Sequence, residues 1–129
     1  MPAGTYAFER IGSFAWAGGA AAKAGTLVAM LVDETCNLPG ASTVKPLGVL
    51  AQDVEIGGTA TVILCGSGAI VIVSAGGTIA LNDMMTSNAS GLAIATTTAT
   101  HWVYGICRKA AANGQYAMMQ LVGDHVITA

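Results

Sequence analysis

The feature that most constrains this 129-residue chain is a strand–turn–strand unit that its sequence contains twice. The unit reads PLGVLAQDVEIGGTATVILCG at residues 46–66 and returns as VYGICRKAAANGQYAMMQLVG at residues 103–123. A constant offset of 57 residues pairs identical residues of the two copies: Gly48 with Gly105, Gly57 with Gly114, Ala60 with Ala117, Leu64 with Leu121, and Gly66 with Gly123. Because one such unit cannot bury its hydrophobic face alone, the repeat predicts two related β-units that close one barrel.

The glycines of this repeat have predicted structural roles. Gly57-Gly58 and Asn113-Gly114 are turn pairs that can supply positive φ angles. Gly66 and Gly123 are expected to end strands where the chain bends. The full set of structural turn glycines is Gly48, Gly57, Gly66, Gly105, Gly114 and Gly123.

β-strand patterns dominate the chain from Gly25 onward. Short apolar and β-branched runs alternate with Gly, Asn, Asp and Pro at intervals of about 10 residues, the spacing typical of an all-β sandwich or barrel. No stretch has helical periodicity of the length that indicates a helix. The sequence therefore predicts an all-β fold, a small β-barrel over residues 25–129 with an N-terminal extension or arm over residues 1–24.

The predicted extension carries most of the aromatic residues of the chain. Its aromatic side chains are Tyr6, Phe8, Phe14 and Trp16, set among glycines that make independent folding costly. One interpretation makes them anchors that dock onto another molecule. The other makes the segment an ordered extension packed on its own domain.

The low charge of the chain also needs an explanation. Hydrophobic residues make up 53% and charged residues only 9%, against about 25% charged residues in an ordinary soluble domain. Either other protein copies cover much of the surface, or the chain is a small Ala- and Gly-rich monomer. The longest strictly apolar run, residues 27–32, is too short to span a membrane. A formal net charge of −2 with five scattered cations argues against nucleic-acid binding.

Chemistry is not expected from the reactive side chains. Cys36, Cys65 and Cys107 are odd in number and lack metal-binding spacing, and Cys65 and Cys107 fit buried strand positions and a reducing cytoplasm. His101 with Cys107 lacks a nucleophile motif, and the Ser-x-x-Lys spacing of residues 42–45 lacks its companion motifs. We expect a non-enzyme with no catalytic residue, no cofactor and no metal.

The order of these elements resembles the capsid cement, or head decoration, proteins of tailed bacteriophages. The resemblance covers about residues 24–123 and is carried by glycine and aliphatic patterns at residues 25–28, 47–49, 55–58 and 61–66. Asn82-Asp83 departs from it, because that family usually has Gly-Asp there. The aromatic N-terminal segment is outside the common pattern.

The resemblance implies a compact barrel or β-tulip-like domain that binds the major capsid protein. Such proteins commonly form homotrimers on the capsid exterior and stabilise it by bridging capsomers, and many small contacts become strong by multivalency. The localisation implied is the virion, after synthesis in the host cytoplasm. Tyr6, Phe8, Phe14 and Trp16 are then candidates for capsid or subunit contact. Two alternatives stay open: another virion β-module of the tail, fibre or vertex, and a small non-catalytic cellular binding domain.

Overall fold

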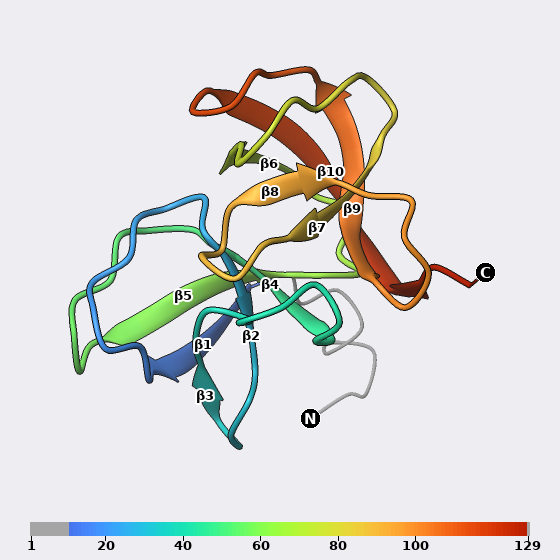
Figure 1. The fold of residues 1–129 in the computed structure, drawn as a ribbon. Helices are drawn as coiled ribbons and strands as arrows, with labels where there is room; N and C mark the ends of the chain where they lie inside the picture. Colours follow the sequence, from blue (N-terminus) through green and yellow to red (C-terminus); the bar gives the residue numbers. More distant parts are fainter. Residues whose placement is uncertain (1–10, 129) are drawn as a thin grey trace, which may run out of the picture.

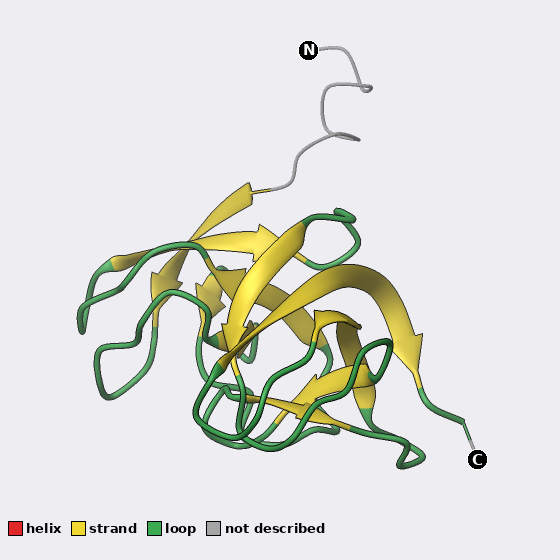
Figure 2. Cartoon of the chain, turned by 90° about the horizontal axis from the view of Figure 1, so that it is seen from above, coloured by secondary structure: helices red, strands yellow, loops and turns green. Residues whose placement is uncertain are grey.

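The computed structural model of the protein describes residues 11–128, which form strands and loops without a helix (Figure 1 and Figure 2). The strands are β1 (Ile11–Trp16), β2 (Leu27–Ala29), β3 (Thr35–Cys36), β4 (Pro46–Leu50), β5 (Thr59–Leu64), β6 (Ile70–Ser74), β7 (Met84–Ser87), β8 (Ala93–Ala95), β9 (Trp102–Lys109) and β10 (Tyr116–Val126). The all-β, barrel-like fold predicted from the sequence is confirmed.

The strands form two five-stranded sheets that divide the chain into two consecutive units. The first unit, β1 to β5, has the strand order β2-β4-β5-β1-β3, and the second unit, β6 to β10, has the order β6-β10-β9-β7-β8. In Figure 1 they are the lower-left and upper-right halves of the molecule. The two units therefore curl as separate sheets instead of sharing the strands of one barrel.

The ladders of the two sheets have the same register, which confirms the repeat. In the first unit β4 and β5 pair as Gly48↔Leu64, Val49↔Ile63 and Leu50↔Val62, and in the second β9 and β10 pair as Gly105↔Leu121, Ile106↔Gln120 and Cys107↔Met119. These pairs differ by the offset of 57 residues seen in the sequence. β1 and β6 are equivalent too, since Phe14 pairs with Ala60 as Val73 pairs with Ala117.

A short strand brings the two ends of each sheet together. In the first unit β3 pairs in parallel with the end of β1, and a bridge from Ala29 to Asn37 connects it to β2. In the second unit β8 pairs with β7, and a parallel bridge from Ala75 to Ala93 connects it to the end of β6. Each sheet thus curls around its own core.

The two units build their cores from equivalent positions, but the side chains at those positions differ in size. The first core contains Trp16, Val28, Cys36, Leu50, Val54, Ala60 and Val62. The counterparts in the second core are Ala75, Met85, Ala93, Cys107, Ala111, Ala117 and Met119. The first unit fills its centre with the indole of Trp16, whereas the second has Ala75 there and takes volume from Met85 and Met119 instead. Close packing requires this exchange, because an unfilled interior loses contacts on every side.

Residues 11–24, which the sequence assigned to the extension, contribute to the first unit. β1 lies between β5 and β3, so its backbone groups are paired on the β5 side and, at its end, on the β3 side. Ala22 then bridges to Val54 as Ile79 bridges to Ala111 in the second unit. The predicted boundary at residue 24 therefore lies within the first unit, between β1 and β2.

Three of the six predicted turn glycines, Gly57, Gly66 and Gly114, lie in turns, whereas the turn role is wrong for Gly48, Gly105 and Gly123, which lie within strands β4, β9 and β10. A Cβ on Gly48 would lie 2.1 Å from the carbonyl oxygen of Ile63, and a Cβ on Gly105 would lie 2.4 Å from that of Gln120. Gly57, Gly66 and Gly114 have positive φ angles. Gly123 does not end a strand as predicted, because β10 continues to Val126 and Gly123 lies where its ladder with β9 shifts register.

Candidate interaction surfaces

The surface side chains of the two units can be compared at equivalent positions of the internal repeat. Two positions that share strand, register and sheet face are under the same packing constraints from the fold. Where one unit exposes an apolar side chain and the other a polar one, the fold itself does not require the apolar residue. Clusters of exposed apolar side chains of this kind are therefore candidates for contact with another molecule, whereas a single one is ordinary on a protein surface.

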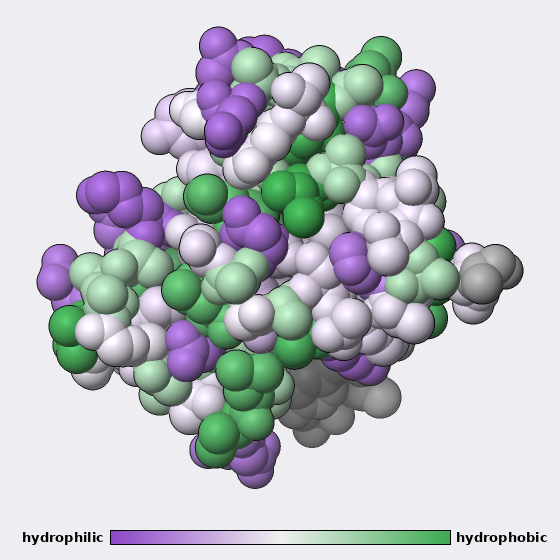
Figure 3. Space-filling model, viewed as in Figure 1, coloured by the Kyte–Doolittle hydropathy of each residue, from purple (hydrophilic) through white to green (hydrophobic). Residues whose placement is uncertain are grey.

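The connection between β2 and β3 is the first such surface, which we call the β2–β3 tip (residues 30–34). Met30, Leu31 and Val32 are exposed there, followed by exposed Asp33 and Glu34. Figure 3 shows hydrophobic side chains at the lower tip of the molecule, where Figure 1 places this connection. Its counterpart in the second unit, residues 87–91, reads Ser-Asn-Ala-Ser-Gly. The apolar tip belongs to the first unit alone.

Two local interactions fix the shape of the β2–β3 tip. The backbone N–H and the hydroxyl of Thr35 both donate to the carbonyl of Val32, at 3.1 and 2.7 Å. Glu34 has a φ of 60°, in the left-handed region that favours glycine, and its counterpart is Gly91 with a φ of 78°. The first unit therefore holds a carboxylate residue where the second has glycine.

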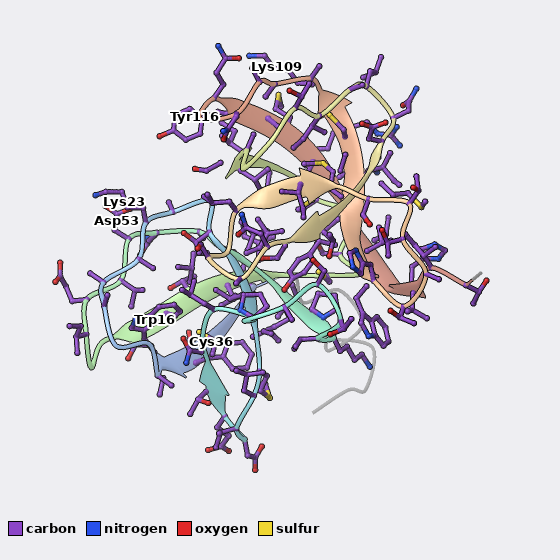
Figure 4. The ribbon with its side chains drawn as sticks, viewed as in Figure 1. Trp16, Lys23, Cys36, Asp53, Lys109 and Tyr116 are labelled. Atoms are coloured by element: carbon purple, nitrogen blue, oxygen red, sulfur yellow. The ribbon has the colours of Figure 1, made fainter. Side chains whose placement is uncertain are left out.

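The outer side of β6 and β10 is the second surface, which we call the β6–β10 face (Ile70, Ile72, Tyr116 and Met118). Ile70, Ile72 and Tyr116 are each more than half exposed, and Met118 is half-buried beside Ile72, its ladder partner. Figure 4 shows Tyr116 on the outside of the second unit. The four counterparts on β1 and β5 are Ile11, Ser13, Thr59 and Thr61. Three of the four positions are therefore polar in the first unit and apolar in the second.

A groove runs along the outer edge of β6, next to this face. It has a volume of about 580 Å³, and its walls include Ile63 of the first unit and Tyr116 of the second. Lys23 and Asp53 also line it, and their exposed side chains form an ion pair of 3.8 Å. The groove is thus lined mainly by apolar residues, with one charged pair among them.

The aromatic candidates from the sequence have different positions. Trp16 is 5% exposed and lies inside the first unit beside Cys36 (Figure 4), with its indole N–H donating 2.9 Å to the carbonyl of Ala20. Phe14 packs against the same core. Both therefore fit the interpretation of a segment packed on its own domain. Tyr6 and Phe8 lie outside the described residues.

The reactive side chains are used for structure. Cys36 and Cys107 are buried, and burial raises the pKa of both thiols, which disfavours the nucleophilic thiolate. His101 shares a 2.8 Å hydrogen bond with Thr96, and the hydroxyl of Ser42 donates to the carbonyl of Ser87. Lys45 lies over the ring of Trp102, with its Nζ 5.7 Å from the ring centroid.

Residues 11–128 also lack two further features. No group of three or more His, Cys, Asp or Glu side chains there is placed to hold a metal ion. That part of the chain also contains no helix long and apolar enough to cross a membrane.

Neither surface is among the predictions from the sequence, although one signal in the sequence could have revealed them. The run AIVIVS at residues 69–74 is apolar on both faces of a strand, which is unusual for a strand with one face exposed to water. Comparing the two copies at the constant offset of 57 residues sets Tyr116 against Thr59, and Leu31 against Asn88. The decisive signal is therefore the difference between the repeats.

Comparison with known proteins gives a likeness in structure. No protein-family model matches this chain, and a search of curated proteins finds no match. Among solved structures, the crystal structure of the head fiber gp8.5 N base of bacteriophage phi29 is similar with a TM-score of 0.65. The alignment has 24% sequence identity and covers 89% of this chain and 99% of that chain. The two proteins share a fold over nearly their whole length.

Proposed function

We propose that the protein is a structural component of a bacteriophage virion, carried on the outside of the head. The observation that carries this proposal is the fold shared with a phage head fiber base across 89% of the chain. The resemblance of residues 24–123 to head decoration proteins points the same way. A decoration protein that bridges capsomers is the form of this function that we favour.

The surface of the described residues supports a binding role over a chemical one. The reactive side chains described above are buried or engaged in structural hydrogen bonds. The β2–β3 tip and the β6–β10 face, in contrast, expose apolar side chains that the fold does not require. Such surfaces are typical of contact with other proteins.

The β2–β3 tip is our candidate for contact with the major capsid protein. Leu31 and Val32 protrude as two adjacent apolar side chains, and Asp33 and Glu34 add negative charge directly beside them. A complementary site is an apolar pocket with basic residues at its rim. Since decoration multiplies a small contact over many copies, a tip of this size is sufficient.

Copy number in purified particles tests the function. Quantitative mass spectrometry should find this chain in amounts comparable to the major capsid protein, because a decoration protein covers the lattice. A few copies per particle would support the alternative of a tail, fibre or vertex module. Absence from particles would contradict the virion proposal and favour a cellular binding domain.

A matched pair of variants tests the tip. Met30→Ser, Leu31→Asn and Val32→Ala together install the residues of the second unit, which that fold already accommodates. We expect this variant to lose at least about tenfold in binding to particles that lack the protein. Ile56→Asn is the control, because Ile56 is exposed in another turn and its counterpart is Asn113. Equal binding by both variants would exclude the tip.

The N-terminal candidates need their own variant. Tyr6→Ala with Phe8→Ala leaves β1 and Trp16 in place, whereas a deletion that reaches residue 20 would remove β1 from the first sheet. Lost particle binding with an unchanged melting temperature would assign these two residues to the head contact. Unchanged binding would remove them from it.

A further inference from the structure

We propose that the β6–β10 face is the surface through which a second copy of this chain docks. The inference concerns the free protein in solution and does not depend on the virion proposal. It assigns a surface and a partner: Ile70, Ile72, Tyr116 and Met118 of one copy pack against another copy of the same chain.

These side chains contribute little to the fold that carries them. Val71 and Val73, which alternate with the isoleucines of β6, point inward and are buried. The first unit builds the same pair of strands with Ser13, Thr59 and Thr61 at the outer positions. The apolar outer side of the second unit therefore needs another explanation, and coverage by a partner is the simplest.

The lack of charge on the β6–β10 face favours a second copy as the partner. The four side chains of the face are uncharged, as are Ser74 and Gln120 at the remaining outer positions of the two paired segments. Two cations on β9 lie at its margin: Lys109 is the ladder partner of Met118, and Arg108 donates a hydrogen bond to Gln120. A charge at a contact between copies recurs on the other copy and is costly to bury unless an opposite charge meets it. The uncharged apolar centre of the face needs no such pairing.

The exposed apolar area of the face is large enough to contribute to a stable contact. An aromatic side chain can bury roughly 150–250 Å², and two exposed isoleucines add to Tyr116 on the same face. The face therefore supplies a substantial part of the roughly 800 Å² per partner that a standard interface buries. The groove beside β6 adds further surface, and Tyr116 at its wall is the type of residue that anchors such contacts.

Exchange between the repeats makes a test that preserves the fold. Ile72→Ser, Tyr116→Thr and Met118→Thr together give the second unit the residues Ser13, Thr59 and Thr61 of the first. Sedimentation velocity and light scattering of the full chain, over a concentration series, measure the mass. We expect wild type to form a defined multimer of the 12.9 kDa chain. The triple variant should dissociate at least about a hundredfold more readily.

Two measurements keep the test decisive. Ile56→Asn is the control and should retain the multimer, because it removes an equally exposed apolar side chain outside the face. Far-ultraviolet circular dichroism must show that the triple variant is folded; if it is not, Tyr116→Thr alone replaces it. A dimer and a trimer both support the proposal, which names a face and not a number of copies.

The outcomes that overturn the proposal differ from those that overturn the virion function. A wild-type protein that stays monomeric at the highest soluble concentration would overturn it, as would a folded face variant that keeps its multimer. Neither result bears on whether the chain is present in particles. A multimeric chain that is missing from particles would contradict only the virion function.

Discussion

The hydroxyl of Tyr104 on β9 donates a hydrogen bond of 3.1 Å to the backbone carbonyl of Val28 on β2. Tyr104 is buried, and its side chain belongs to the second unit while its acceptor belongs to the first. The contact lies beside Leu27 and Val49, first-unit residues that pack into the larger core cluster of the second. Each unit has its own core, and this junction joins them.

The stability of the protein should fall at alkaline pH because of Tyr104. Burial, and secondarily the nearby Cys65, hold the pKa of Tyr104 well above its ordinary value. The folded state therefore keeps its proton while the unfolded state releases it above about pH 10, so the free energy of unfolding declines as pH rises past that point. Urea denaturation at pH 8 and pH 10.5 measures the decline.

Tyr104→Phe separates this effect from general alkaline destabilisation. The variant should cost about 1–3 kcal/mol at pH 8, because the carbonyl of Val28 loses its buried donor. Its stability should then fall less between the two pH values than that of wild type. An identical decline in both proteins would mean that Tyr104 does not cause it, leaving the buried thiols of Cys36 and Cys107 to be tested.

Gly48→Ala and Gly105→Ala should destabilise the protein to a similar extent. In both, the new methyl group would meet the backbone carbonyl of the neighbouring strand at less than 2.5 Å, so the ladder must shift. We expect a loss of about 1–3 kcal/mol or more for each, read from denaturation midpoints. Gly19→Ala, which meets no atom within 4 Å, is the control and should change little.

Trp16→Ala should destabilise the isolated protein by about 3–5 kcal/mol, because it empties the centre of the first core. That is a large part of the 5–15 kcal/mol typical of a domain. Calorimetry of the free chain measures the loss. If Trp16 served only to contact another molecule, the melting temperature of the free chain would not change.

Glu34→Gly should stabilise the protein by about 0.5–1 kcal/mol, since glycine accepts a φ of 60° without the strain of a side chain. The second unit already has Gly91 at this position. Asp33→Gly is the comparison and should not stabilise, because Asp33 is not among the residues with positive φ. A destabilised Glu34→Gly protein would indicate that the carboxylate makes a favourable interaction at the β2–β3 tip.

The repeat could be followed from sequence only as far as its offset stayed constant. Residues 22 and 54 bridge as residues 79 and 111 do, 57 positions later, but Trp16 corresponds to Ala75, a difference of 59. The loop at residues 18–21 is longer than its counterpart at 77–78, so the offset of 57 fails for β1. For that reason residues 11–16 read as part of an extension instead of the first strand of the first unit.

The sequence by itself determined the all-β class and the presence of two related units. Both follow from local information: short apolar and β-branched runs, turn glycines such as Gly57 and Gly114, and the recurrence of glycines at a fixed spacing. Such signals act within a few residues, so they can be read without knowing which strands pair. The close approach of Gly48 and Gly105 to the neighbouring strand came only from the structure.

Only the tertiary structure decided which apolar side chains are inside and which are available to partners. Trp16 and Tyr116 are both aromatic residues at strand ends, yet one fills a core and the other is exposed. The difference arises because burial depends on which distant strand covers each side chain: the first sheet curls over Trp16, whereas no described segment covers the outer side of β10 at Tyr116. Long-range pairing, and not local pattern, therefore placed the candidate interaction surfaces.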